Sequence, residues 1–135
     1  DIRLESINGD ARASTSDGNI SVVRIAGSTS LKTSDGNISF EDLSGSLTAS
    51  TSDGNVTGNV LELKRELTIK TSDGNIAVTI PGRLGLDLNI KGESLVVPLT
   101  NFTGQSDEKS IQGKSNGGGT PVNLSTSGNV TLSYR

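Results

Sequence analysis

The stretch Thr15-Ser16-Asp17-Gly18-Asn19 decides the fold, because it recurs unchanged at residues 33–37, 51–55 and 71–75. A shorter version, Thr-Ser-Gly-Asn, occupies residues 126–129, and Ile or Val follows every copy. The four full copies begin 18, 18 and 20 residues apart. Near-constant spacing of identical segments is typical of repeat proteins. The chain is therefore built from repeated units, each containing one copy of this stretch.

Apolar and polar residues alternate on both sides of each copy, which is the pattern of half-buried strands. No sustained 3.6-residue period is present, so we expect an all-β chain. A second turn signal, at residues 26–28 and 44–46, lies half a period away and divides each unit into strand, turn, strand and turn. The apolar pairs that follow the full copies are Ile20/Val22, Ile38/Phe40, Val56/Gly58 and Ile76/Val78.

The Asp-Gly-Asn part of each copy has the composition of a tight turn. Asp can accept backbone N–H bonds, Asn tolerates left-handed geometry, and Gly takes a positive φ at no steric cost. We therefore assign these residues a structural turn role and no catalytic or cofactor-binding one. They are Asp17, Gly18, Asn19, Asp35, Gly36, Asn37, Asp53, Gly54, Asn55, Asp73, Gly74, Asn75, Gly128 and Asn129.

Two architectures fit this unit. In an antiparallel meander, every second turn lies on one edge of a single sheet, about two strand spacings apart. In a solenoid, equivalent positions stack directly, one strand spacing of about 4.8 Å apart. A single-sheet meander needs another layer over its apolar face, whereas the two strands of a solenoid coil close their own core. We therefore predict a β-solenoid, a β-helix-like stack of two-strand coils of about 18 residues.

The length of 135 residues suits one domain, and we expect a single β-repeat domain over residues 1–135. Residues 1–82 should form regular coils, and residues 83–135 an irregular C-terminal capping region, because a solenoid must cover its terminal apolar layers. The capping region should contain a strand at 84–90, a second apolar run at 94–99, a protruding loop at 104–110, a Gly-rich turn at 116–119 and a last coil from 122–126 and 130–134.

Composition excludes several classes of function. His, Cys, Met and Trp are absent, so zinc sites and nucleophile systems that need His or Cys cannot form, and we expect no cofactor. The net charge is −3, so no basic surface indicates nucleic-acid binding. No apolar run approaches the ~20 residues that cross a bilayer, so we expect no direct membrane insertion of this segment.

The repeated aspartates are the clearest candidates for a metal site. If the coils stack in register, Asp17, Asp35, Asp53 and Asp73 line one corner. Calcium could bridge such carboxylates, since it accepts carboxylate, carbonyl and water oxygens. The motif lacks the Gly-Gly-x-Gly-x-Asp pattern of calcium-binding β-rolls and offers one carboxylate per coil. We therefore favour a turn role over calcium and predict no metal site.

The other acidic residues do not indicate an enzyme. Glycoside hydrolysis needs two carboxylates on either side of a sugar cleft. Most acids here lie in repeated turns or at polar strand positions, whereas an active site is a singular feature on a scaffold. We expect a solvated surface role for Glu41, Asp42, Glu62, Glu66 and Asp87.

The Ser-Asp-Gly-Asn coils and the closing stretch GGGTPVNLSTSGNVTLSYR, residues 117–135, together resemble a bacterial family of β-strand repeat domains. Its members are labelled as adhesins and have no established function. The resemblance covers nearly the whole chain. It implies a β-solenoid or β-helix-like domain that is exported or attached to envelope proteins, and it carries over no catalytic residue.

We therefore expect a non-enzymatic module of the bacterial surface or envelope that contacts a protein or a glycan. A structural spacer and a calcium-stabilised β-roll are the alternatives. The solenoid ends carry unpaired strand edges through which copies can pair. A functional site is expected where the repeat is broken, at Lys64-Arg65 in the lengthened coil or at residues 101–119. Because the chain opens at Asp1, we expect a mature protein or an excised domain, extracellular, on the cell surface or in the periplasm.

Overall fold

The computed structural model describes residues 1–81, 83–97 and 101–134, and it is all-β in these residues. No described helix is long and apolar enough to span a membrane. The strands are β1 (Ile2–Asn8), β2 (Ala11–Thr15), β3 (Ile20–Thr33), β4 (Ile38–Thr51), β5 (Val56–Thr71), β6 (Ile76–Ile80), β7 (Leu86–Lys91), β8 (Ser94–Val96), β9 (Phe102–Ser106), β10 (Ser110–Ser115), β11 (Thr120–Ser125) and β12 (Asn129–Tyr134).

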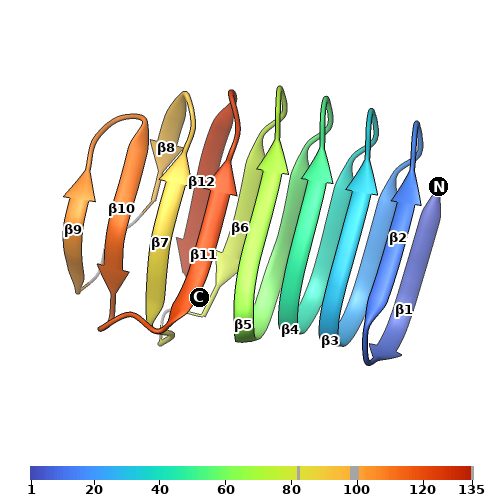
Figure 1. Cartoon of the computed structure of the whole chain (residues 1–135), viewed down its shortest axis with the longest axis horizontal. Helices are drawn as coiled ribbons and strands as arrows, with labels where there is room; N and C mark the ends of the chain where they lie inside the picture. Colours follow the sequence, from blue (N-terminus) through green and yellow to red (C-terminus); the bar gives the residue numbers. More distant parts are fainter. Residues whose placement is uncertain (82, 98–100, 135) are drawn as a thin grey trace.

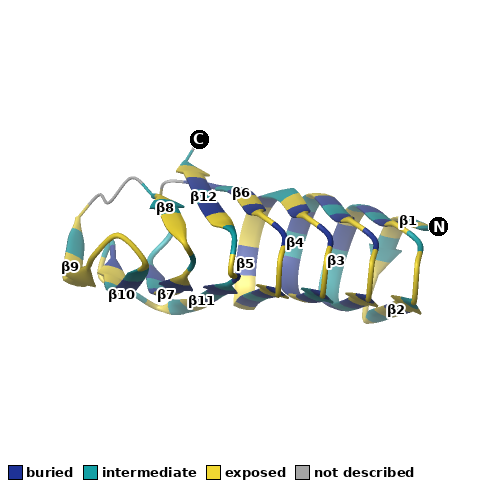
Figure 2. Cartoon of the chain, turned by 90° about the horizontal axis from the view of Figure 1, so that it is seen from above, coloured by how far each residue is buried: buried dark blue, intermediate teal, exposed yellow. Residues whose placement is uncertain are grey.

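The strands form a flattened solenoid with two layers, seen from the side in Figure 1 and from above in Figure 2. We call the layer whose strands lead into the Thr-Ser-Asp-Gly-Asn corner the entry layer, and the layer that follows this corner the exit layer. The corner itself is the first corner. The second corner lies on the opposite side, near Gly9, Gly27 and Gly45, and β3, β4 and β5 run continuously through it.

Pairing in the regular part is parallel with partners 18 residues apart. Ile20 pairs with Ile38 in the exit layer, and Leu31 pairs with Ala49 in the entry layer. These parallel partners confirm the solenoid and rule out the meander. The inward residues after the first corner are completely or almost completely buried, as Ile20 and Ile38 are at 0% exposure. Each coil therefore supplies both halves of its own core.

Two side-chain ladders hold the first corners together. Thr51 Oγ1 donates to the Gly36 carbonyl of the preceding coil at 3.0 Å and accepts from the N–H of Gly54 in its own turn at 3.3 Å. Asn37 Oδ1 accepts the N–H of Asn55 at 2.8 Å. The neighbouring coils repeat both arrangements. Thr and Asn therefore satisfy the backbone groups of the turn, as polar groups away from water must be satisfied.

We predicted that the glycine of this turn is needed for a positive φ, and this reason was wrong. The glycines at positive φ are elsewhere, as at Gly27 in the second corner with φ 126°. Gly36 is required by close stacking instead, because a Cβ on it would overlap the carbonyl oxygen of Gly18. Gly54 and Gly74 meet the preceding coil in the same way. We also expected Asp to accept backbone N–H bonds in this turn, but the side chains of Thr and Asn accept them instead.

The lengthened coil keeps the register of its neighbours and places its extra residues at the second corner. Gly45 pairs with Leu63, but the next partners are Leu47 and Leu67. Two more residues therefore stand between the partners in β5 than in β4. Lys64 and Arg65 belong to this insertion, and both are exposed.

The C-terminal coil lies inside the stack and not at its end. β11 is inserted between β5 and β7 in the entry layer, and β12 between β6 and β8 in the exit layer (Figure 1). Its corner continues both ladders, since Thr126 Oγ1 donates to Gly74 O and Asn129 N–H donates to Asn75 Oδ1 at 2.9 Å. The predicted coil is confirmed, but its place as the last coil was wrong.

The rest of the predicted capping region is more regular than expected. The polar stretch expected to protrude as a loop at 104–110 is mostly the antiparallel hairpin of β9 and β10, with only residues 107–109 between the strands. Residues 86–90 and 94–96 are strands as predicted, while residues 98 and 99 lie outside the described residues. The Gly-rich turn is confirmed by the bond from Gly118 N–H to Ser115 O at 3.1 Å.

Candidate binding face

The repeated aspartates form an exposed row along the first corners. Asp53 lies between Asp35 and Asp73, and its pKa is raised by desolvation and then by these two neighbouring carboxyl groups. Among the described residues, no group of three acidic side chains is arranged to hold a metal ion. The row therefore brings like charges together without forming a built cation site.

The acids considered for glycoside hydrolysis are spread over both layers and the second corner. Glu41 and Asp42 belong to the exit-layer half of β4, and Asp87 belongs to the entry layer on β7. Glu62 is exposed at the exit-layer end before the long insertion, and Glu66 lies just after this insertion. Of these five acids, Glu66 alone lines a hollow of the described surface, so the solvated surface role remains the better interpretation.

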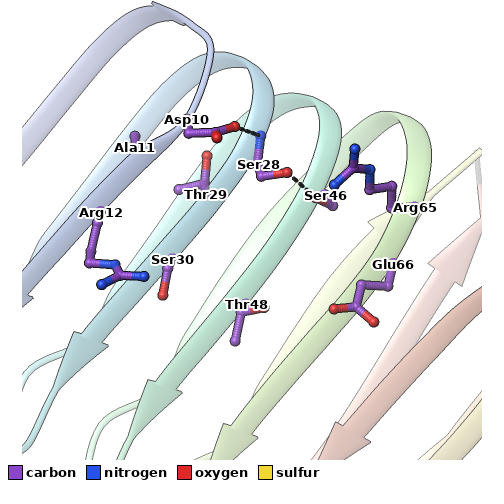
Figure 3. A pocket seen from close by; sticks show the side chains of 10 residues that line it. All are labelled: Asp10, Ala11, Arg12, Ser28, Thr29, Ser30, Ser46, Thr48, Arg65 and Glu66. Carbon is purple, nitrogen blue, oxygen red and sulfur yellow. Dashed lines mark hydrogen bonds between the residues drawn. The ribbon is translucent and has the colours of Figure 1, made fainter.

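A hollow of about 490 Å³ lies on the outer surface of the entry layer, beside the lengthened coil (Figure 3). Arg12 on β2 and Arg65 on β5 stand at opposite ends of it, and Ser30 and Thr48 lie between them. The strands β2 to β5 are consecutive in the layer, so the two arginines are three strand spacings, about 14 Å, apart along the stack. The remaining lining residues are Asp10, Ala11, Ser28, Thr29, Ser46 and Glu66.

The two arginines are free to bind a ligand. Both belong to the described residues, where the ion pairs are Arg3–Glu5 and Lys109–Glu93 and no side-chain hydrogen bond involves Arg12 or Arg65. A guanidinium group presents five donors in a planar fork that matches carboxylate groups. The hollow therefore has an unpaired cationic group at each end.

Two hydroxyl groups of the hollow are hydrogen-bonded to each other, and the backbone of one of these serines is bonded to Asp10. Ser46 Oγ donates to Ser28 Oγ at 3.0 Å, and the Ser28 N–H donates to Asp10 Oδ1 at 3.3 Å. The side chain of Thr29 is buried at 3% exposure, and its Oγ1 has no hydrogen-bond partner among the described residues. In Figure 3 this hydroxyl points toward Asp10. A buried hydroxyl without a hydrogen-bond partner destabilises the fold, so packing alone does not explain a threonine at this position.

Comparison with known proteins places the chain in a family. The model of the family Toastrack DUF4097 matches residues 10–133. The chain belongs to this family. No curated protein and no solved structure matched this Toastrack chain.

A second hollow of about 190 Å³ opens on the same surface of the Toastrack domain, farther along the stack. It lies over β5, β11 and β7, where the C-terminal coil is inserted. Lys70 and Lys91 stand on the two outer strands, and Ser125 stands between them. Thr68, Asn89 and Asn123 supply the neighbouring polar groups. Sequence reasoning missed this site, because residues 123 and 125 are far in sequence from their neighbours.

The structure also places the predicted breaks in the repeat. Arg65 lines the large hollow, and Lys64 lines an adjoining one of about 250 Å³. Residues 101–119 contain the hairpin at the far end of the stack and the turn that leads back into it. The lengthened coil is therefore the break that contributes to the candidate binding face.

Proposed function

We propose that this Toastrack domain is a non-enzymatic module of the bacterial surface or envelope. Its outer entry-layer surface contacts a protein or a glycan, in the manner of an adhesin. The observation that carries the proposal is the hollow between Arg12 and Arg65, where two unpaired guanidinium groups lie on either side of a hydroxyl-lined surface. The all-β repeat fold and the family match support a binding module, since neither brings a catalytic constellation with it.

The chemistry of the hollow suits distributed polar contacts. Ser30 and Thr48 can each donate and accept hydrogen bonds, and Glu66 can accept bonds from ligand hydroxyl or amide groups. Arginine is enriched among the residues that dominate binding energies at interfaces. The two arginines should therefore contribute most of the affinity, with the hydroxyl groups setting orientation.

The proposal is tested with a glycan array and a pull-down from envelope extracts. The double variant Arg12→Gln/Arg65→Gln is compared with Arg3→Gln/Arg83→Gln, which removes the same charge outside the hollow. We expect any binding partner of the wild type to lose affinity about tenfold or more in the first variant only. Equal losses in both variants would show that the hollow is not the contact site. Protease accessibility on intact cells that carry the full-length protein tests the surface location.

A rigid spacer is the second candidate function. The continuous Thr and Asn ladders favour it, because they join every first corner from Asn19 to Asn129. A spacer needs no ligand, so negative results with both the array and the pull-down would support it. Single-molecule or scattering measurements of the full-length protein would then have to show a fixed separation between the neighbouring domains.

Calcium stabilisation is tested separately. Among the described residues, the feature that favours it is the exposed aspartate row around Asp53. A ligand that binds the folded state raises the melting temperature by mass action. We expect melting curves recorded with millimolar calcium and with a chelator to coincide. A rise with calcium that Asp53→Asn abolishes would instead support the β-roll.

A further inference from the structure

A row of alternating serines and lysines crosses the entry layer from one strand to the next. Members on adjacent strands are paired in register in every case. Their side chains point outward, because each is next in its strand to a buried core residue. The row, which we call the Ser/Lys row, consists of Ser14, Lys32, Ser50, Lys70, Ser125, Lys91 and Ser110.

The alternation depends on the inserted C-terminal coil. Lys70 on β5 and Lys91 on β7 would be adjacent if β11 were absent, but Ser125 stands between them. Figure 1 shows β11 in this place. The result is a lysine on every second strand, at intervals of two strand spacings, or about 9.6 Å. This period is not visible in the order of residues along the chain, and it arises only when the strands pair.

The lysines of the row are available to a ligand. Lys32, Lys70 and Lys91 are exposed and make no ion pair or side-chain hydrogen bond among the described residues. The second hollow lies between Lys70 and Lys91. A parallel row of uncharged polar side chains runs beside the lysines and ends at Arg12 in the large hollow. The uncharged row consists of Ser30, Thr48, Thr68, Asn123, Asn89 and Gln112, and Arg12 is the next residue beyond Ser30.

We propose that the Ser/Lys row binds a linear acidic polysaccharide that lies along the stack, across the strands. This inference rests on the proposed function and names its ligand class. One sugar unit is about as long as one strand spacing. In a flat glycan chain with a twofold repeat, every second carboxylate points to the same side, so carboxylates on one side recur every two strands. Each such carboxylate meets a lysine, and the hydroxyl groups meet the serines and the uncharged row.

The same surface suits other anionic polymers less well. A peptide that binds by strand addition needs a free strand edge. The strands β3, β4, β5, β11 and β7 are paired on both sides. Single-stranded nucleic acid binds through stacking on aromatic side chains, and neither row contains one. The narrow line of lysines and the hydroxyl and amide groups beside it favour a saccharide.

The test uses oligomannuronate, a flat chain of carboxylate-bearing sugars, with a neutral cello-oligosaccharide of equal length as the control ligand. Affinity is measured by calorimetry on the whole chain at physiological salt. The variant Lys32→Ser/Lys70→Ser/Lys91→Ser leaves serines along the whole row, a residue that the row already accommodates. We expect its affinity to fall about tenfold. The control Arg3→Ser/Arg24→Asn/Lys109→Ser removes the same charge elsewhere and should change affinity less than twofold.

A second variant separates spacing from charge. Ser50→Lys/Lys70→Ser keeps three lysines and the same net charge but shifts one of them by one strand. Binding by general charge attraction would be unchanged, whereas a ligand matched to the two-strand period should lose affinity about threefold or more. Far-UV circular dichroism and melting temperature check that each variant folds as the wild type does.

The outcomes distinguish this inference from the function on which it rests. Unchanged binding in the serine variant, or equal binding of poly-glutamate or anionic vesicles, would overturn the acidic polysaccharide. If oligomannuronate fails while another glycan or a protein binds at the Arg12–Arg65 hollow, the inference fails and the proposed function stands. If no ligand of either class binds, both fail.

Discussion

The regular coils before residue 81 and the strands after residue 86 build the same kind of stack by different routes. In the first region each coil follows the previous one in the chain, with partners 18 residues apart. In the second region the order across the entry layer is β5, β11, β7, β10 and β9, which is not the chain order. Pairing nevertheless stays parallel across the boundary, where Val122 lies between Leu67 and Leu88.

The difference shows that a strand's place is set by what its side chains meet and not by where it comes in the chain. Thr126 and Asn129 make the bonds that Thr71 and Asn75 make one coil earlier. The inward Leu124 continues the buried column that Ile69 occupies in the neighbouring strand. The C-terminal coil is therefore recognised as a repeat unit although 39 residues, 81–119, separate it from the coil it follows in space.

Removal of residues 120–135 should have the largest effect. No described strand of β7 to β10 pairs with β5 or β6, so the C-terminal coil joins the two regions. Four inward side chains of this coil are at most 1% exposed, namely Val122, Leu124, Val130 and Leu132. Burying each is worth about 1.5–3 kcal/mol, which together approaches the whole stability of a domain. We expect amides of residues 86–115 to lose protection in hydrogen exchange while those of β3 and β4 keep it. Retained protection in β7 would show that the regions hold together without this coil.

Gly54→Ala should destabilise the regular region by about 2 kcal/mol or more, as overpacking against a rigid neighbour does. A Cβ there would overlap the carbonyl oxygen of Gly36, and backbone cannot yield easily. Gly128→Ala should cost less, because its Cβ would lie 2.5 Å from the Gly74 oxygen and has more room. Ser52→Ala, on the exposed side of the same turn, is the control and should change the free energy of unfolding by less than about 0.5 kcal/mol. Urea denaturation measures all three.

Thr71→Val should cost about 1–3 kcal/mol, because it leaves Gly54 O and Gly74 N–H without the Thr71 hydroxyl as partner. Valine keeps the volume, so the lost hydrogen bonds dominate. Thr126→Val removes the equivalent hydroxyl from the C-terminal coil and should cost a similar amount. A markedly smaller loss at position 126 would mean that the ladder weakens where the chain order changes.

Asp53→Asn should have the smallest effect and should raise the melting temperature at pH 7. Desolvation and the neighbouring Asp73 and Asp35 raise the pKa of Asp53 in the folded state, so folding favours its protonated form. Protonated Asp53 is favoured by folding, so its stabilising contribution is complete below the unfolded pKa of about 3.9. This contribution is lost as pH rises through the raised pKa of the folded state. The advantage of the asparagine variant should disappear near pH 3. An unchanged difference across this range would contradict the proximity of the carboxyl groups.

Much of the fold was predictable, because the repeat reports directly on it. The period, the two-strand coil and the position of the first corner followed from Thr15–Asn19 and its copies. The contribution of the lengthened coil to a candidate site was also predicted from Lys64 and Arg65. Each of these features is determined by residues close together in the sequence, so a short segment is enough to predict it.

The remaining features depend on contacts between distant segments. The position of β11 between β5 and β7 depends on contacts with both of these strands. The alternation of its own residues would be the same if β11 lay at the end of the stack. The Ser/Lys row follows from that position. Ser6, Arg24 and Asp42 have φ of 55–57° although none is glycine. Their 18-residue spacing was visible, but three different side chains at one repeat position carry no common signal for a left-handed residue.

The insertion of the C-terminal coil also has a consequence for synthesis on the ribosome. Domains fold as their segments emerge, and the coils up to β5 can add one after another. β7 to β10 emerge before the residues that connect them to β5, so they must wait with unpaired edges until residues 120–134 leave the exit tunnel. A chain interrupted in this interval exposes the open edge of β5, which is a template for aggregation. The stack is completed in its middle, and only a chain that has been extended through about residue 134 can complete it.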